Sequence, residues 1–201
     1  MLTACWRPER QWSNCPMDPF AYLSVLVSIV LGLGITQLLM GFSRWLEQRK
    51  AFGAFGPAIA WAAILLLVHF QSWWSMYGMR TYVDWTFVQF SMVLLQPILL
   101  FLLAVLIFPS STSPDQNLRS NFFHQRPWFF GLILTLLVAS LLKDLARSGT
   151  LPEAANVGFH VAGIVVAGLG LALMDERTHR WLAYFALLSF IAYIAVLFAE
   201  L

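Results

Sequence analysis

Residues 19–43 read PFAYLSVLVSIVLGLGITQLLMGFS, and this stretch contains no Lys, Arg, Asp or Glu. About 20 apolar residues in an α-helix cross the hydrocarbon core of a bilayer, so this stretch is long enough to span a membrane. Five more uncharged stretches follow it, at 51–79, 85–114, 127–142, 154–174 and 181–199. The sequence therefore predicts six membrane crossings.

The composition agrees with a chain that lies almost wholly in lipid. Hydrophobic residues make up 60% of it and charged residues 11%, whereas soluble domains carry roughly a quarter charged residues. Backbone groups in lipid must be satisfied internally, so each apolar run predicts a helix, and the lack of period-2 alternation excludes a β-barrel. We expect an all-α membrane protein, a six-transmembrane-helix bundle that forms one domain over residues 17–201.

The first sixteen residues, MLTACWRPERQWSNCP, are polar and unlike the rest of the chain. Met17 then opens the run that leads into the first apolar stretch, so we interpret residues 1–16 as an N-terminal tail that can arise from a misplaced start codon. Both cysteines, Cys5 and Cys15, lie in this tail. The spans therefore offer no thiolate for a metal or redox site, and a disulfide in the tail would be a local link only.

The expected helices cover 19–43, 57–78, 85–108, 127–146, 155–174 and 180–200. Pro57 and Pro127 are placed at helix starts, where the missing N–H of proline costs nothing. Residues 115–126 are expected to form a separate short helix at the membrane surface, with Phe122 and Phe123 among the lipid headgroups.

Counts of Lys and Arg in the connections predict the orientation, because short cytoplasmic loops are enriched in both. One side of the membrane receives seven of them: Arg44, Arg49, Lys50, Arg119, Arg126, Arg177 and Arg180. The other side receives Arg80, Lys143 and Arg147, joined by Arg7 and Arg10 if the tail is translated. We therefore expect both termini on the periplasmic side of a bacterial inner membrane.

Small residues predict which helix faces approach a neighbour closely. In the first helix they recur every four residues, and in the fifth they alternate at spacings of three and four. The residues predicted to serve helix packing are Ser24, Ser28, Gly32 and Thr36, and Gly163, Ala167 and Gly170. We expect these two helices to be central and the bulkier third and fourth helices to be peripheral.

Polar and ionisable side chains inside a membrane are costly, so each one is a candidate for function. Most of them fall in the half of the bundle that the charge count places outside. We predict a polar, outward-facing pocket that binds or conducts a small solute or an apolar ligand, lined by His69, Gln89, Gln96, Lys143, Asn156 and His160. The alternative is that the same residues only make hydrogen bonds between helices, in an accessory or assembly subunit of a larger membrane complex.

The sequence carries no recognised catalytic motif, and the spans contain no carboxylate pair and no His–Glu metal motif, so no enzymatic activity, cofactor or metal is predicted. A third reading is an electron carrier that binds quinone, or haem b between His69 and His160, whose depths differ by roughly one helical turn. The net charge of +2 does not indicate nucleic acid, because the basic residues lie near predicted helix ends. The predicted partners are the lipid bilayer and either further copies of the chain or a larger membrane complex.

Three segments, DPFAYLSVLVSIVLGLGITQLLMGFSRW (18–45), HFQSWWSMYGMR (69–80) and HQRPWFFG (124–131), resemble a family of hypothetical multi-spanning membrane proteins of bacteria, particularly proteobacteria. The resemblance covers most of the chain after Met17. It implies a bacterial inner-membrane location and a start at Met17, and it implies no catalytic residues.

Overall fold

The computed structural model describes residues 19–80, 86–109, 117–149 and 153–197. The tail at residues 1–16 and Met17 lie outside this part of the chain. Within it every regular element is a helix, which confirms the all-α prediction.

The long helices are α1 (Pro19–Glu47), α3 (Gly56–Ser75), α4 (Phe87–Ile107), α5 (Leu118–Ser148), α6 (Ala154–Ala172) and α7 (Glu176–Leu197). Two short helices, α2 (Arg49–Phe52) and η1 (Met76–Met79), follow α1 and α3. Six helical segments of the described chain are long and apolar enough to cross a membrane, as expected.

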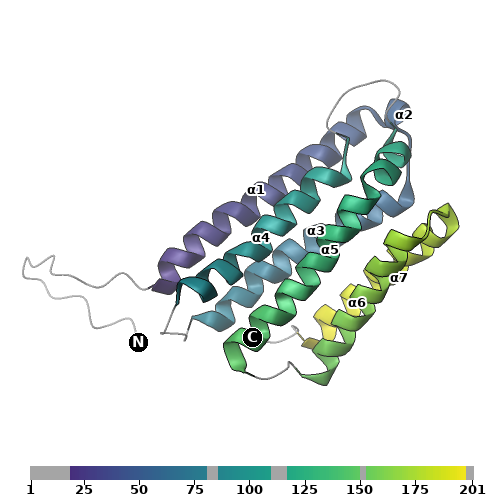
Figure 1. The fold of residues 1–201 in the computed structure, drawn as a ribbon. Helices are drawn as coiled ribbons and strands as arrows, with labels where there is room; N and C mark the ends of the chain where they lie inside the picture. Colours follow the sequence, from purple (N-terminus) through teal and green to yellow (C-terminus); the bar gives the residue numbers. More distant parts are fainter. Residues whose placement is uncertain (1–18, 81–85, 110–116, 150–152, 198–201) are drawn as a thin grey trace, which may run out of the picture.

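Helix α4 lies between α1 and α5 and also packs on α3, which in turn contacts α1, α5 and α7 (Figure 1). Helix α6 packs on α5, and α7 packs on α3 and α6, so these two close the other side. The expectation that the first and fifth membrane helices are central is therefore wrong. Bulky Leu, Ile and Phe side chains fill the space between helices, and α4 is rich in them.

The face of α1 that enters the bundle carries Leu23, Val27, Leu31 and Leu38. Gly34, between Leu31 and Leu38, approaches His69 of α3, and Gly41, after Leu38, approaches the ring of Phe108 at the end of α4. A Cβ atom at either glycine would overlap its neighbour.

The structure differs from the expected small-residue face of α1. Ser24 and Ser28 are only half-buried, Thr36 is exposed, and a Cβ atom added at Gly32 would meet nothing within 4 Å among the described residues. The hydroxyls of Ser24 and Thr36 donate to carbonyls of α1 itself. The four-residue spacing is present in the sequence, but leucine and valine occupy the inward face.

On α6 the expected small residues do lie against a neighbour. A Cβ at Gly163 would stand 3.1 Å from Leu137 of α5, and one at Gly170 would stand 2.5 Å from Phe130. Ala167 between them is fully buried. The small side chains allow α6 to lie close to the aromatic and aliphatic face of α5.

Helix α5 runs without interruption from Leu118, so Pro127 lies inside it and the expected separate surface helix does not exist. An internal proline costs a helix about 3 kcal/mol, which local propensity does not offset. Two features hold the first turns in place: Asn117 caps the helix by accepting a hydrogen bond from the Ser120 backbone N–H at 2.7 Å, and Phe122 is buried, 3% exposed, against Phe55 and Phe130. The expected position of this ring among the headgroups is therefore wrong, because the core buries it.

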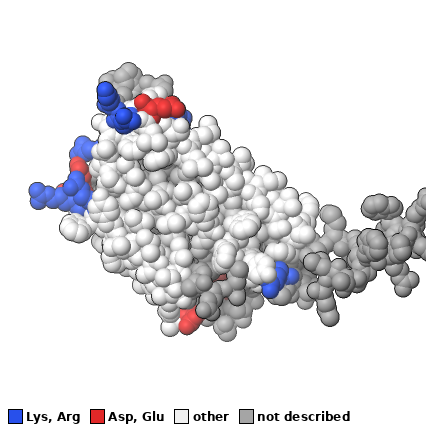
Figure 2. Space-filling view, turned by 180° about the vertical axis from the view of Figure 1, so that it is seen from behind, with Lys and Arg blue, Asp and Glu red and all other residues white. Residues whose placement is uncertain are grey.

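Charged side chains gather at the ends of the helices and leave a broad uncharged surface between them (Figure 2). We call the end that holds the end of α1 and the starts of α5 and α7 the basic end, because Arg44, Arg49, Arg119, Arg177 and Arg180 lie there. The opposite end holds the start of α1 and the end of α7. This distribution is the one that a chain spanning a bilayer requires.

Candidate functional site

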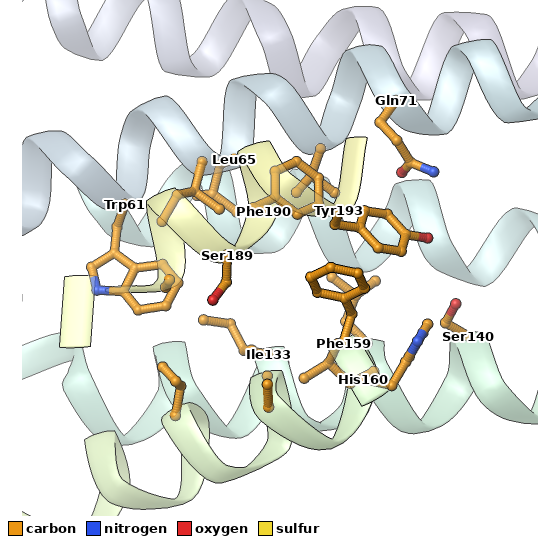
Figure 3. Close-up of a pocket in the computed structure, with 18 of the residues that line it drawn as sticks. Trp61, Leu65, Gln71, Ile133, Ser140, Phe159, His160, Ser189, Phe190 and Tyr193 are labelled. Atoms are coloured by element: carbon orange, nitrogen blue, oxygen red, sulfur yellow. The ribbon is translucent and has the colours of Figure 1, made fainter. Parts of the chain in front are cut away.

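A cavity of about 180 Å³ lies among α3, α4, α5, α6 and α7 (Figure 3). Its walls are mainly aliphatic and aromatic, with Trp61 and Leu65 from α3, Ile133 from α5, Phe159 from α6 and Phe190 from α7. An apolar cavity of about 150 Å³ is large enough for benzene. The cavity therefore has room for one ring with small substituents.

Most polar groups of this cavity are gathered at one end, and Ser189 lies between that end and Trp61 (Figure 3). Figure 3 shows Gln71, Ser140, His160 and Tyr193 together there, with Trp61 at the far end. Gln71 is close to the end of α3 and Tyr193 close to the end of α7, so the polar end of the cavity faces the opposite end of the bundle from the basic one. The arrangement suits a molecule with an apolar body and one polar head.

His160 presents a hydrogen-bond acceptor to the polar end. Its Nδ1 lies 2.9 Å from the backbone oxygen of Asn156 in the preceding turn of α6. A carbonyl oxygen only accepts, so Nδ1 carries the proton, and Nε2 of the neutral ring keeps its lone pair. His160 is 7% exposed and lines the cavity. It can therefore accept a hydrogen bond from a ligand hydroxyl.

Gln96 links the cavity wall to a chain of hydrogen bonds across three helices. Its Nε2 donates to Ser72 Oγ of α3 at 2.9 Å, and its Oε1 accepts from Lys143 Nζ of α5 at 2.8 Å. Both ends of the amide are therefore occupied, and Lys143 is not a lining residue of the cavity. Gln96 fixes helices relative to one another beside the cavity.

His69 lies on the other side of α3, against α1. Its ring is fully buried, and Nδ1 lies 2.7 Å from the Leu65 backbone oxygen. Nε2 points at Gly34 and has no hydrogen-bond partner among the described residues. Glycine leaves the space that the imidazole fills, so this histidine packs α3 on α1 and does not line the cavity.

Two other predicted residues also lie away from the cavity. Gln89 forms a capping box with Thr86 at the start of α4, with 3.0 Å between the Thr86 backbone N–H and Gln89 Oε1. Asn156 lies in the first turn of α6, and its Oδ1 is buried without a donor from the described residues. Of the six predicted pocket residues, the structure brings only Gln96 and His160 to the cavity.

The side chains that complete the polar end were not among the predicted site residues. Ser140 is a single hydroxyl inside an apolar run, and Tyr193 is near the end of the last helix, whereas Ser189 lines the cavity between this end and Trp61 (Figure 3). The hydroxyls of the two serines and the Gln71 amide have no hydrogen-bond partner among the described residues. The polar residues within the apolar helices were visible in the sequence. The sequence did not indicate, however, which helix faces pack against one another.

The histidines do not fit a haem held by two axial ligands. His69 and His160 face different helices, and the Nε2 of His69 is closed off by Gly34. A cavity of about 180 Å³ is the size of a single ring and not of a porphyrin. In the described part of the chain, no three His, Cys, Asp or Glu side chains gather as a metal site would need.

Comparisons with known proteins do not assign the chain to a family. No protein-family model, no curated protein and no solved structure matches the chain. The six apolar helices establish a multi-pass integral membrane protein in contact with the lipid bilayer.

Proposed function

We propose that this integral membrane protein binds a small, mostly apolar molecule with a hydroxyl head in the cavity among α3, α4, α5, α6 and α7. The observation that carries the proposal is the separation of polarity inside the cavity, with His160, Ser140 and Gln71 at one end and aromatic walls elsewhere. Ligand sites in proteins have this character: apolar walls and a few polar groups that fix orientation.

The chemistry of the head follows from the hydrogen-bonding groups at the polar end. His160 offers a lone pair on Nε2, and the Ser140 hydroxyl can donate or accept (Figure 3). A phenol or a hydroquinone ring has an O–H to donate to the imidazole and a flat apolar body for the aromatic walls. A reduced quinone ring is thus among the molecules that suit the site.

The proposed setting is a bacterial inner membrane with the basic end in the cytoplasm. The excess of Arg and Lys at that end supports this orientation. The polar end of the cavity then faces the periplasmic half of the bilayer, and a membrane-dissolved ligand can enter from the lipid between helices.

Matched fluorinated rings test the proposal on the purified full chain in detergent. Binding of 4-fluorophenol and fluorobenzene is followed by ¹⁹F NMR. We expect 4-fluorophenol to bind about fivefold more tightly, since one neutral hydrogen bond contributes about 1 kcal/mol. His160→Phe should abolish this preference and leave fluorobenzene binding intact.

Two alanines on α7 supply the control. Ala186 lines the cavity, whereas Ala192 faces outward. Ala186→Leu should fill the cavity and abolish binding of both rings, and Ala192→Leu should bind both as the unaltered protein does. If the Ala186→Leu protein still binds both rings with unchanged affinity, the cavity is not the site and the proposal fails.

The second candidate function, a subunit of a larger membrane assembly, is favoured by the outward face of α1. Gly32 and Thr36 are exposed there and leave a shallow surface with no neighbour from the described chain. Small residues facing lipid permit close helix association. In a background without Cys5 and Cys15, oxidation of Gly32→Cys in native membranes should give a disulfide-linked dimer if copies associate here, whereas Leu142→Cys, exposed on α5, should not.

A further inference from the structure

A second cavity, of about 620 Å³, lies at the basic end, between the start of α5 and the turn that joins α6 to α7. Asn117, Arg119, Ser120 and Arg126 line it from α5, with Phe123. Met174 and Glu176 line it from the α6–α7 side. It shares no residue with the cavity described above, and the proposed function does not use it.

Arg126 is the unusual member of this lining. Only 7% of it is exposed, yet its guanidinium charge has no carboxylate within ion-pair distance among the described residues. One guanidinium nitrogen donates to the Leu173 backbone oxygen at the end of α6, which also accepts from His179 Nε2 at 2.9 Å. A buried charge is costly without a counter-charge. An anion bound beside Arg126 would therefore lower the cost of burying its charge.

The neighbouring acid is already engaged elsewhere. Glu176 accepts from Arg119 Nε at 2.8 Å and from Arg180 at 3.2 Å. One carboxylate thus serves two guanidinium groups and leaves the walls of the cavity with an excess of positive charge. The first turn of α5 adds the positive end of its helix dipole.

Phosphate is the anion whose geometry these groups match. Guanidinium groups bind phosphate oxygens through paired N–H donors, and the Ser120 hydroxyl can add another donor. The depth also agrees, because Trp128 and Trp181, 71% and 76% exposed, lie near this end as interfacial tryptophans do. Basic pockets between membrane helices on the cytoplasmic side are suited to anionic lipid headgroups.

We propose that the cavity at the basic end binds the phosphate group of an anionic phospholipid, held by Arg126 and Arg119 at the start of α5. The acyl chains of that lipid would lie along the exposed apolar surface, where Phe123 and Met174 form the rim. A bound lipid would neutralise Arg126 and link α5 to the α6–α7 turn.

The test measures the thermal unfolding of the full chain in detergent during titration with dihexanoyl phosphatidylglycerol. Dihexanoyl phosphatidylcholine, with the same chains and no net charge, and inorganic phosphate are titrated in parallel. We expect phosphatidylglycerol to raise the unfolding temperature and the other two to raise it much less. Each variant is compared with its own unliganded state, so a loss of intrinsic stability does not obscure the result.

Three substitutions remove the same charge from different places. Arg126→Gln should weaken phosphatidylglycerol binding by at least about tenfold, or about 1.4 kcal/mol, because it removes a charge-assisted hydrogen bond. Arg119→Gln, at a 60% exposed side chain, should weaken it as well without disturbing the core. Arg177→Gln is the control, since Arg177 is exposed at the same end and does not line the cavity.

Three results would overturn the proposal. Equal stabilisation by phosphatidylcholine would mean that the acyl chains alone account for binding. Equal stabilisation by inorganic phosphate would mean that the site serves free phosphate and not a lipid. An equal loss in Arg177→Gln would mean that the attraction is the diffuse charge of the basic end.

Discussion

The contact between Gly34 and His69 shows how a single missing methyl group positions two membrane helices. The imidazole of His69 is fully buried, and its Nε2 faces the backbone of α1 at Gly34. Inside a bilayer there is no hydrophobic force to press helices together, so close packing of this kind supplies much of the association energy. The histidine is thus a packing residue.

Gly34→Ala should destabilise the protein by about 1–3 kcal/mol, because the new methyl group would overlap the His69 ring. Gly32→Ala, on the exposed face of the same helix, should leave stability unchanged or raise it slightly, since alanine favours helix over glycine by about 1 kcal/mol. Thermal unfolding in detergent, followed by circular dichroism, measures both. Equal unfolding temperatures for the two variants would contradict the packing role of Gly34.

Asp175 controls the start of α7 at the basic end. Its carboxylate accepts from the Thr178 backbone N–H at 3.0 Å, and this hydrogen bond, helped by the Thr178 hydroxyl and the charge of Arg177, lowers the pKa of Asp175 below its ordinary value. The lowered pKa means that the folded state favours the charged form. The stabilisation is therefore complete above the ordinary Asp pKa of about 4 and is lost as the pH falls through the lower folded pKa.

Asp175→Asn should remove this pH dependence, because the amide still caps the helix but does not titrate. Asp175→Ala should lower the unfolding temperature at neutral pH as well, and its difference from the unaltered protein should shrink in acid. Unfolding temperatures measured from pH 6 down to pH 3 test this. A pH profile of Asp175→Asn identical to that of the unaltered protein would show that the carboxylate contributes nothing.

At the residue scale, the sequence indicated that polar groups in the spans were worth examining, but it did not separate their roles. His69 and His160 are both histidines in apolar helices, and each bonds the carbonyl four residues earlier through Nδ1. His69 contacts Gly34 of α1, whereas His160 lines the cavity. Only the neighbour across the helix interface distinguishes them, and that neighbour is distant in sequence.

At the element scale, the link from Lys143 through Gln96 to Ser72 joins α5, α4 and α3. A polar side chain that loses its partner in a low-dielectric interior bears the full cost of desolvation. These hydrogen bonds therefore favour one rotation and one depth of α5 relative to α4, where leucine packing alone would tolerate several.

A double-mutant cycle between Lys143→Met and Gln96→Leu should give a coupling energy of about 1–2 kcal/mol, because either single change already removes the hydrogen bond from Lys143 Nζ to Gln96 Oε1. The control cycle pairs Gln96→Leu with Thr135→Val, because the Thr135 hydroxyl donates to the Gly131 carbonyl of its own helix. Unfolding free energies in mixed detergent micelles supply the values. Additive effects in the first cycle would show that the 2.8 Å contact does not stabilise the bundle.

Helix existence was predictable, whereas helix faces and some boundaries were not. Pro127 suggested that a helix starts there. The structure instead begins α5 at Leu118, where the Asn117 cap and the buried Phe122 ring stabilise the turns before Pro127. Small residues on α1 suggested an inward face, but Gly34 and Gly41 mark the close approaches and Gly32 faces out. In an all-apolar helix the amphipathic signal is weak, so packing with neighbours decides the rotation.

At the scale of the whole molecule, the uneven distribution of Arg and Lys predicts how the bundle is inserted. We expect Glu47→Cys, at the basic end, to be protected from a membrane-impermeant maleimide in intact bacterial cells. Glu153→Cys, exposed at the opposite end, should react. The two changes remove the same charge, so they form a matched pair.

The labelling is done after Cys5 and Cys15 are replaced by Ser, and permeabilised cells supply the control in which both positions react. The reverse pattern, with Glu47→Cys labelled and Glu153→Cys protected, would place the basic end outside. The proposed entry of a ligand from the periplasmic half of the bilayer would then be wrong as well.

The sequence by itself determined that this protein lies in lipid, how many of its helices are long enough to span the membrane, and that these alternate in direction, because uncharged runs of sufficient length have only one stable form in lipid. The tertiary structure alone decided that α4 packs between α1 and α5, that His160 and Gln96 reach a cavity while His69 packs on Gly34, and that Arg126 is buried beside a second cavity. Those outcomes depend on which helix faces meet. Nearly every helix face is apolar, so the fit of individual side chains across the interfaces decides which faces pack together.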